Sequence, residues 1–274
     1  AKALEANGII AKGERLYAEV HTAEAERELL KAQKTVETLY SALSNTLGGD
    51  ESTYIPATSM FILSDIENVS YFKDLAKQHS PLLKQVGYKK QLATENMRLQ
   101  RADFAPQVAL TGMAAFYNYQ VSPIIPKWAV GAGVSLKIFD GLNREYKFSA
   151  AKSQIRQVEA VGHQAESDIL TLIDKLYNEM VTYSQQLPSV NASGRFAEEY
   201  LRIKEEAFKE GAAPSSDVVD ARLNLAKIRI ERLQAAYYYD MMLARLLEAC
   251  GQSELFPDYG KRAAAMPIRY EHDF

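Results

Sequence analysis

The stretch from Phe104 to Asp140 constrains the fold most, because its residues alternate between large apolar side chains and small or polar ones. The sequence on either side instead repeats its apolar residues at helical spacing. A period of two residues is typical of a β-strand with two different faces, and prolines between two such runs indicate a turn. We therefore predict antiparallel strands near 106–119 and 128–139, connected by a turn at Ser122–Pro126.

One face of the predicted hairpin is apolar. It carries Val108, Leu110, Gly112, Ala114 and Phe116 in the first strand, and Trp128, Val130, Ala132, Val134, Leu136 and Ile138 in the second. Each run is long enough to cross a bilayer, which takes about 9–11 tilted residues. Tyr117, Tyr119 and Trp128 gather near the turn, where an aromatic girdle at the membrane interface is expected. A soluble hairpin packed against helices would produce the same alternation and remains the alternative.

The sequence before the hairpin is predicted to be largely helical. Residues 1–47 follow a helical pattern with breaks at Asn7-Gly8 and near Gly13, and Gly48 ends it. An extended connector and a short helix at Tyr71–Gln78 follow. A further helix begins at Ser80-Pro81, with serine as the N-cap and proline in the first helical position.

After the hairpin we expect an antiparallel pair of long helices. The first runs from Leu142 to Glu210, with a break at Pro188–Gly194 because proline lacks an amide hydrogen. The chain then turns at Gly211–Asp217, and the returning helix extends from Asp217 to Cys250. The tail beyond Gly251 reads as short and irregular.

Heptad-spaced apolar residues predict the packing seam of these helices. In the outgoing helix the predicted seam is Ile155, Val158, Gly162, Ala165, Ile169, Leu172, Leu176, Met180 and Tyr183, then Phe196, Tyr200, Ile203 and Ala207. In the returning helix it is Val219, Leu223, Ala226, Ile230, Leu233 and Tyr237.

An internal repeat relates the two ends of the chain. An offset of 203 residues carries Gly8 onto Gly211 and Gly48 onto Gly251 without a gap. Six further positions between them are identical: Ala18, Ala23, Glu28, Leu30, Ala32 and Leu43 fall on Ala221, Ala226, Glu231, Leu233, Ala235 and Leu246. Glu14 falls on Asp217. Residues 1–48 are therefore predicted to be the end of a first repeat whose beginning has been removed.

Neither the composition nor the motifs of the chain indicate a catalytic, metal-binding or nucleic-acid-binding site. The chain has 274 residues and a net charge of −3, and we find no basic stripe, which argues against nucleic-acid binding. The single cysteine, Cys250, cannot form an internal disulfide, and no run of 18 apolar residues predicts a membrane-spanning helix. Since the histidines are scattered and no nucleophile has a nearby partner, we expect no metal, no cofactor and no enzymatic activity.

Several motifs in this order resemble the TolC-type outer membrane efflux proteins. Ser80-Pro81-Leu82 followed by Ala102–Val108 is similar to the entry helix and first strand of that family's second repeat. Trp128–Gly131 and Val134–Gly141 are similar to its second strand and the exit into the long helix. Gly211 with Asp217 is similar to its periplasmic turn, although Pro214 stands where a small polar residue is usual.

The resemblance implies a mainly α fold with a β-hairpin, in which long antiparallel coiled-coil-like helices form an α-barrel and the hairpin gives two strands of a transmembrane β-barrel. It also implies a homotrimer in the outer membrane that extends into the periplasm. There the subunit would be a passive conduit for small molecules or proteins in a tripartite efflux or type I secretion system, coupled through a periplasmic adaptor to an inner membrane pump. This chain holds two of the family's four strands.

We accordingly divide the chain into six segments. They are the end of the first helical hairpin (1–49), a connector or equatorial region (50–80), the entry helix (81–104), the barrel hairpin (105–140), the long helical hairpin (141–250) and an equatorial tail (251–274).

Two sites are expected at the helix turn. The adaptor-binding tip is predicted to comprise Gly211, Ala212, Ala213, Pro214, Ser215, Ser216 and Asp217, with Gly8 and Glu14 of the first repeat. Glu205, Glu206 and Glu210 crowd the same turn, either as a solvated helix end or as an acidic ring at a pore mouth. The alternative function is a soluble coiled-coil interaction or scaffold protein without transport activity.

Overall fold

The computed structural model describes residues 2–6, 8, 10–48, 59–114, 128–263 and 268. It divides into two compact units. Unit 1 comprises Ala1–Phe72, Ile173–Glu248 and Gln252–Phe274, and unit 2 comprises Lys73–Leu172 and Ala249–Gly251. Within the described ranges, no helix combines the length and the apolar character that a membrane crossing requires.

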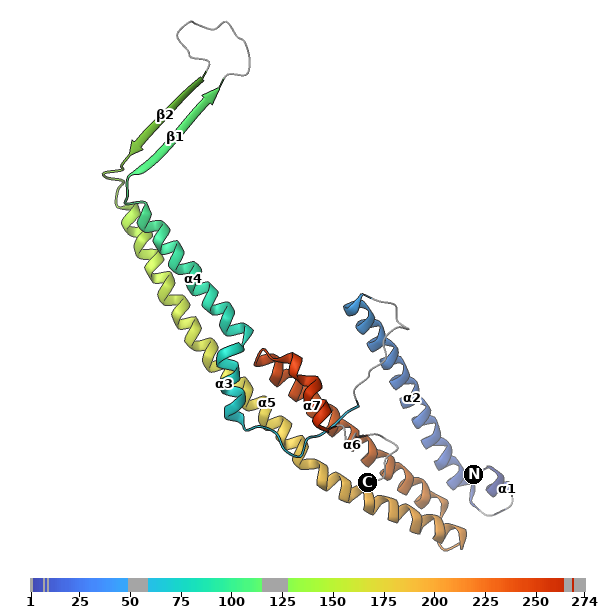
Figure 1. Cartoon of the computed structure of the whole chain (residues 1–274). Coiled ribbons are helices and arrows are strands. Elements are labelled where there is room, and N and C mark those ends of the chain that lie inside the picture. The colour runs from blue at the N-terminus through green and yellow to red at the C-terminus, as the bar shows by residue number, and fades with distance from the viewer. Residues whose placement is uncertain are drawn as a thin grey trace, which may run out of the picture. The chain divides into compact units, whose positions relative to one another are not determined.

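The predicted hairpin is confirmed in unit 2. Strands β1 (Gln107–Ala114) and β2 (Trp128–Ser135) pair antiparallel, with Gln107 opposite Ser135 and Ala114 opposite Trp128 (Figure 1). The prediction of strand through residue 139 is wrong, because β2 ends at Ser135. The next residue of the first strand would be Pro106, which has no amide hydrogen to continue the ladder. Residues 115–127, with the predicted turn, Tyr117 and Tyr119, lie outside the described part.

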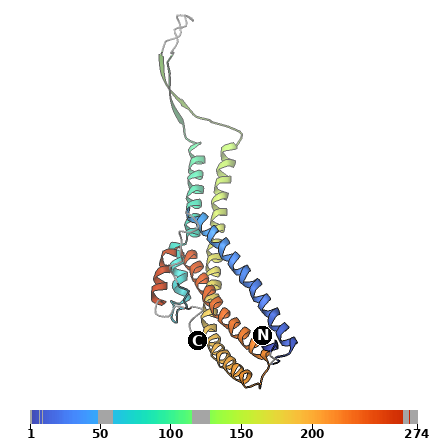
Figure 2. The same cartoon turned by 90° about the vertical axis from the view of Figure 1, so that its right-hand side faces the viewer.

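The hairpin is followed and preceded by helices that run side by side in unit 2 (Figures 1 and 2). Helix α4 (Pro81–Ala102) packs antiparallel to the first part of α5 (Asn143–Lys209). Lys90 Nζ lies 3.0 Å from Glu159 Oε1, and Asn96 Nδ2 donates to Gln154 Oε1 at 3.1 Å. Polar pairs thus bridge the two helices along their exposed edges.

Gly251 and Ser80 meet where unit 2 begins α4. Helix α3 (Val69–His79) ends one residue before Ser80, and Pro81 opens α4 as predicted. The predicted capping bond is absent, because the buried Ser80 side chain makes no hydrogen bond to the helix. Gly251 has a φ of +70°, and a Cβ built on it would collide with the His79 carbonyl and lie 3.0 Å from Pro81 Cδ. Gly251 thus packs directly against the start of α4.

Unit 1 contains the predicted antiparallel pair of the second part of α5 and α6 (Ser215–Ala249). The rings of Tyr183 and Tyr238 stack at 5.3 Å, and Arg229 Nη2 lies 3.0 Å from Glu198 Oε1. Unlike the prediction, α6 begins at Ser215 rather than at Asp217, so the end of the predicted turn is helical.

The seam between α5 and α6 uses a different heptad register from the predicted one. Leu223, Ile230 and Tyr237, which were expected in the seam, are exposed. The buried row of α6 is Val218, Ala221, Leu225, Ile228, Ala235, Tyr239, Met242 and Leu246. In α5, Leu176 and Met180 are buried as predicted, but Phe196, Tyr200 and Ile203 are exposed. Ala197 packs in their place against Leu225 and Ile228. Two adjacent rows of these helices are apolar, and only packing selects one.

Two predicted helix breaks are wrong. Helix α5 continues through Pro188, because it packs against α6 on both sides of this residue, at Tyr183 and at Ala197. Packing over so many turns outweighs the local cost of an internal proline, about 3 kcal/mol. Gly13 lies inside the first turn of α2 (Lys12–Leu47), whereas the predicted break at Gly8 does separate α1 (Lys2–Ala6) from α2.

The tail is partly helical, contrary to the expectation of an irregular segment. It contains a short 3₁₀ turn, η1 (Ser253–Leu255), and α7 (Phe256–Ala263). Phe256 contacts the Phe61 ring at 5.7 Å, and the nearly buried Tyr259 donates a hydrogen bond to Glu67 Oε2 at 3.1 Å. The helix forms because its aromatic side chains find cover on the connector, which the local sequence does not reveal.

Substitution of Gly48 and Gly251 tests whether the contact of Gly251 with the His79 backbone contributes to stability. Both end a long helix with a φ of +70°, at equivalent positions of the repeat, but a Cβ on Gly48 would meet nothing within 4 Å. We expect Gly48→Ala to cost about 1–2 kcal/mol, the strain of the left-handed conformation. Gly251→Ala should cost about 1–3 kcal/mol more, because the His79 backbone must move. Denaturant unfolding measures both, and equal losses would contradict the assigned contact.

Candidate functional site

The turn between α5 and α6 is closed by backbone hydrogen bonds at Gly211. Gly211 has a φ of +73°, its amide donates to Phe208 O at 3.1 Å, and the Ala212 amide donates to Ala207 O at 2.8 Å. This pair of bonds is the Schellman pattern, which requires a left-handed residue after the last helical turn. Glycine takes that conformation without a Cβ penalty. The sequence assignment of Gly211 as a helix-ending residue is therefore confirmed.

Ion pairs fasten α6 to α5 beside this turn. Lys204 Nζ contacts Asp217 Oδ2 at 2.6 Å, and Arg222 Nη2 contacts Glu205 Oε1 at 2.6 Å. The hydrogen bond to Asp217 raises the pKa of Lys204. The carboxylate of Asp217 is thus paired with a cation of α5.

Two of the three glutamates at this turn, Glu205 and Glu206, are paired with cations. Besides the Glu205–Arg222 pair, Glu206 Oε1 lies 2.8 Å from Arg202 Nη1, and Arg202 also binds Glu199. Hydrogen bonding to Glu199 is the main reason that the pKa of Arg202 is raised. Helix-surface pairs of this kind favour a solvated helix end over an acidic pore mouth.

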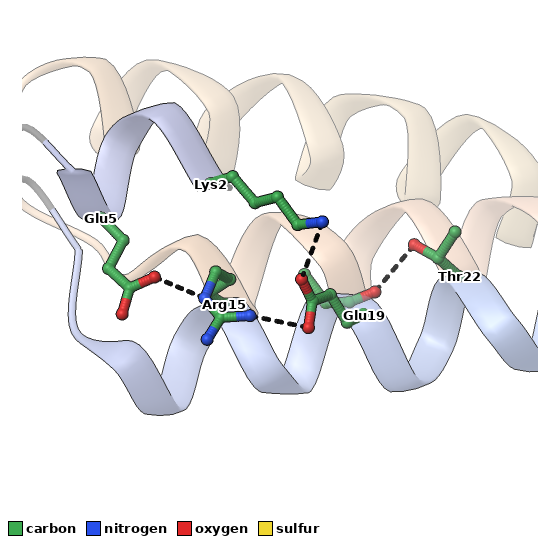
Figure 3. Close-up of polar contacts among 6 residues, drawn as sticks. Lys2, Glu5, Arg15, Glu19 and Thr22 are labelled. Carbon is green, nitrogen blue, oxygen red and sulfur yellow. Dashed lines mark hydrogen bonds and ion pairs between the residues drawn. The ribbon is translucent and has the colours of Figure 1, made fainter.

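The turn of the first repeat has its own polar cluster (Figure 3). Arg15 bridges Glu5 of α1 and Glu19 of α2, and Lys2 Nζ lies 3.7 Å from Glu19 Oε1. Hydrogen bonds to Glu19 and Glu5 raise the pKa of Arg15, and the bond from Arg15 lowers the pKa of Glu19. Gly8, with a φ of +70°, lies between the helices that these residues connect. The sequence prediction placed Gly8 in this turn but missed Arg15.

The two turns contact each other in unit 1. Glu14 Oε2 accepts hydrogen bonds from the Ser215 amide at 3.1 Å and from Ser215 Oγ at 2.6 Å. Tyr17 Oη donates to Asp220 Oδ1 at 2.6 Å, which raises the pKa of Tyr17. Tyr17 and Asp220 are 203 residues apart, so they occupy equivalent positions of the repeat. The structure thus brings together Glu14 and Ser215, two predicted tip residues, and adds a pair that the sequence did not single out.

The same ion pair recurs in both repeats with its charges exchanged. The offset of 203 residues carries Lys2 onto Glu205 and Glu19 onto Arg222. Lys2 pairs with Glu19, and Glu205 pairs with Arg222. Each pair joins the two helices of its turn. The attraction between the helices is therefore retained, although the charge at each equivalent position has the opposite sign. A count of identical residues between the repeats misses this exchange of charges. A comparison of oppositely charged pairs at the same offset would find it.

A second polar centre lies at the base of the hairpin in unit 2. Arg144 Nε is 3.2 Å from Asp140 Oδ2, Nη2 donates to Ile138 O at 3.4 Å, and the guanidinium lies 5.1 Å from the Phe104 ring centroid. A polar cavity of about 70 Å³ adjoins it, lined by residues that include Lys137 and Lys147. Arg144 therefore holds the chain where it passes from strand to helix. In the sequence, the spacing of four residues between Asp140 and Arg144 could have indicated this ion pair.

Metal binding and cysteine chemistry find no support in the described part of the chain. Among the residues described, no group of three or more histidine, cysteine, aspartate or glutamate side chains could hold a metal ion. Burial raises the pKa of Cys250 to about 11, so its thiol is protonated and a poor nucleophile at neutral pH. Trp128, the described member of the predicted membrane-interface group, is exposed as the first residue of β2.

Comparison with known proteins identifies the family. The family model described as outer membrane efflux protein matches residues 73–252, more than half of the chain. The chain belongs to the outer membrane efflux protein family. No curated protein sequence matches it.

Solved structures share the fold of this family member. The outer membrane protein VceC from Vibrio cholerae is 19% identical, with a TM-score of 0.72 and a match covering 91% of this chain and 61% of that chain. The open state of the MtrE outer membrane channel from Neisseria gonorrhoeae is 18% identical, with a TM-score of 0.75 and coverage of 92% and 59%. A membrane protein from Pseudomonas aeruginosa is 18% identical, with a TM-score of 0.74 and coverage of 91% and 60%. The chain thus spans about three fifths of the length of these structures.

Proposed function

We propose that the chain is a channel subunit of an outer membrane efflux system, whose hairpin lies in the membrane and whose helices extend into the periplasm. The observation that carries this proposal is the apolar face of the hairpin. Val108 opposes Val134 and Leu110 opposes Ala132, and these side chains are exposed, Leu110 by 81%. Leaving apolar surface in water costs about 25 cal/mol per Å², whereas lipid removes that cost.

The two open edges of the sheet support a shared barrel. A pair of strands cannot lie alone in hydrocarbon, since the unpaired amides and carbonyls of each edge find no water there. Further strands must pair with β1 and β2, either from other copies or from a longer chain. The opposite face, with Gln107, Thr111 and Ser135, is polar enough to line an aqueous lumen.

Unpartnered apolar rows on the helices support a homotrimer. A groove of about 600 Å³ between α4 and α5 has the apolar residues Ala93 and Val158 and the exposed Leu92 and Leu99 in its lining, together with four polar side chains. In unit 1, Ile230 and Tyr237 form the exposed second row of α6. Helices of other subunits would bury these rows, as heptad-patterned helices do in α-barrels.

The paired turns support the tip assignment. In this proposal Gly211 to Asp217, with Gly8 and Glu14, meets a periplasmic adaptor that connects the channel to an inner membrane pump. The Glu14–Ser215 and Tyr17–Asp220 bonds hold neighbouring helical hairpins together, so their release would let the hairpins separate and the tunnel open. No catalysis is required of a passive conduit. The same geometry would serve protein export by a type I secretion system.

Arginine substitutions on the two faces of β1 test the membrane assignment. We expect Leu110→Arg to block membrane assembly, because arginine on a lipid-facing strand costs about 2–4 kcal/mol at the membrane midplane. Ala109→Arg is the matched control, since Ala109 opposes Gly133 on the other face. Fractionation and detergent extraction of the outer membrane provide the measurement. If both variants assemble equally, the apolar face does not contact lipid.

Removing one hydroxyl tests the opening mechanism. Tyr17→Phe deletes the bond to Asp220, so we expect more frequent or larger conductance steps in planar bilayers. Thr22→Val is the control, because the Thr22 hydroxyl donates to Ala18 O of its own helix at 2.8 Å. Unchanged conductance in Tyr17→Phe, with normal assembly, would contradict a role of this bond in gating.

A bulky charge at the turn tests adaptor binding. Ala212 is exposed and contributes only its backbone amide to the turn, so Ala212→Arg should leave folding and assembly intact. We expect loss of adaptor cross-linking and of efflux. Ser215 is unsuitable for this test because its side chain binds Glu14. Normal cross-linking and efflux in Ala212→Arg would show that the turn is merely structural.

A further inference from the structure

Asp240 of α6 binds the backbone of the connector formed by residues 59–68. Its Oδ2 atom accepts a hydrogen bond from the Phe61 amide at 3.2 Å. Its Oδ1 atom is buried and has no hydrogen-bond partner among the described residues. A carboxylate with one buried, unsatisfied oxygen is poorly solvated, so this contact depends on the charge of the carboxyl group.

The surroundings of the contact are apolar. Phe61 is only 2% exposed, and its ring lies 6.4 Å from that of Tyr239 and 5.7 Å from that of Phe256. Leu63 is also buried, and its carbonyl accepts a bond from Ser184 Oγ of α5 at 3.4 Å. The connector is thus covered by α5, α6 and α7 at the place where Asp240 holds it.

The charged groups nearby do not neutralise Asp240. Glu67 of the connector binds Arg262 of α7 at 2.7 Å and also accepts the Tyr259 hydroxyl. Tyr239 neighbours Asp240 on α6, and burial raises its pKa to about 12, so it carries no charge at neutral pH. From α5, Ser184 bonds the Leu63 carbonyl of the connector, and Tyr183 stacks on Tyr238. Among the described residues, no cation forms an ion pair with Asp240.

We propose that Asp240 is a pH-sensitive latch, which holds the connector against α6 when its carboxyl is protonated and loosens it when the carboxyl ionises. The device goes beyond the proposed function, since it concerns the connector rather than the turn or the hairpin. It needs no partner molecule, because the proton is exchanged with the solvent.

The direction follows from the protonation states. Burial raises the pKa of Asp240 to about 7, and the bond from the Phe61 amide opposes this rise only in part. The docked connector therefore binds the proton more tightly than an open, hydrated form, whose carboxyl has an ordinary pKa near 3.9. Docking is most stable at acid pH and weakens as the pH rises towards 7, by at most about tenfold per pH unit for one proton.

The repeat provides a control at the equivalent position. The offset of 203 residues carries Glu37 onto Asp240. Glu37 is exposed on α2 and pairs with Lys34 at 2.8 Å. A carboxyl at this position of the repeat is thus partly buried in one helix and exposed in the other.

Hydrogen exchange detected by mass spectrometry tests the latch in the purified protein between pH 5 and 8. After correction for the intrinsic pH dependence of exchange, protection of residues 59–68 should fall towards pH 7 and then level off. Asp240→Asn should remove this pH dependence, because an amide stays neutral throughout. Glu37→Gln should retain the wild-type profile.

Three results of the exchange experiment would overturn the proposal. The first is protection of the connector that does not vary with pH in the wild-type protein. The second is an unchanged profile in folded Asp240→Asn. The third is a simultaneous loss of protection in α6, which would indicate general unfolding instead of local release. Infrared spectroscopy of the wild-type protein supplies a check that needs no variant: a protonated carboxyl must titrate near pH 7, and its absence would also overturn the latch.

Discussion

The side-chain seam between α5 and α6 is the interaction on which unit 1 depends. Its buried row places Leu225 and Ile228 against Ala197, and it continues to Tyr239, Met242 and Leu246. This row fixes the rotation of α6, which in turn decides what each neighbouring position meets. Asp217 reaches Lys204, Asp220 reaches Tyr17, and Asp240 faces the connector. A rotation by one heptad position would break all of these contacts together.

The repeat shows how equivalent positions can keep an interaction while changing its chemistry. The Lys2–Glu19 and Glu205–Arg222 pairs have the same place and opposite charges. Attraction between two helices depends on the product of the charges, so an exchange of both partners preserves it. The turns therefore retain a similar geometry while the charge at each position differs. Any partner that contacts both turns must recognise two different surfaces on one backbone framework.

The helices and the hairpin both expose apolar side chains, which indicates that they assemble with other chains or with lipid. The exposed apolar side chains of β1, the second row of α6 and the groove beside α4 are separate features of the two units. Each has the pattern of a surface that is covered in a larger structure. Our proposal assigns lipid to the first and further helices to the others, consistent with the family to which the chain belongs. The connector latch differs, because Asp240 is already covered within one chain.

The sequence by itself determined the hairpin, the helix-ending glycines and the repeat. Alternation of side chains and the tolerance of glycine for positive φ are local properties, and the repeat follows directly from residue identities. The sequence could not determine whether Pro188 breaks α5, because packing over many turns outweighs a local cost. It also could not select between two adjacent apolar rows, nor predict that Ser215 binds Glu14. Glu37 and Asp240 occupy equivalent positions, yet only Asp240 is desolvated. Only the tertiary structure decided these points, because register, burial and proton affinity depend on residues that are distant in sequence.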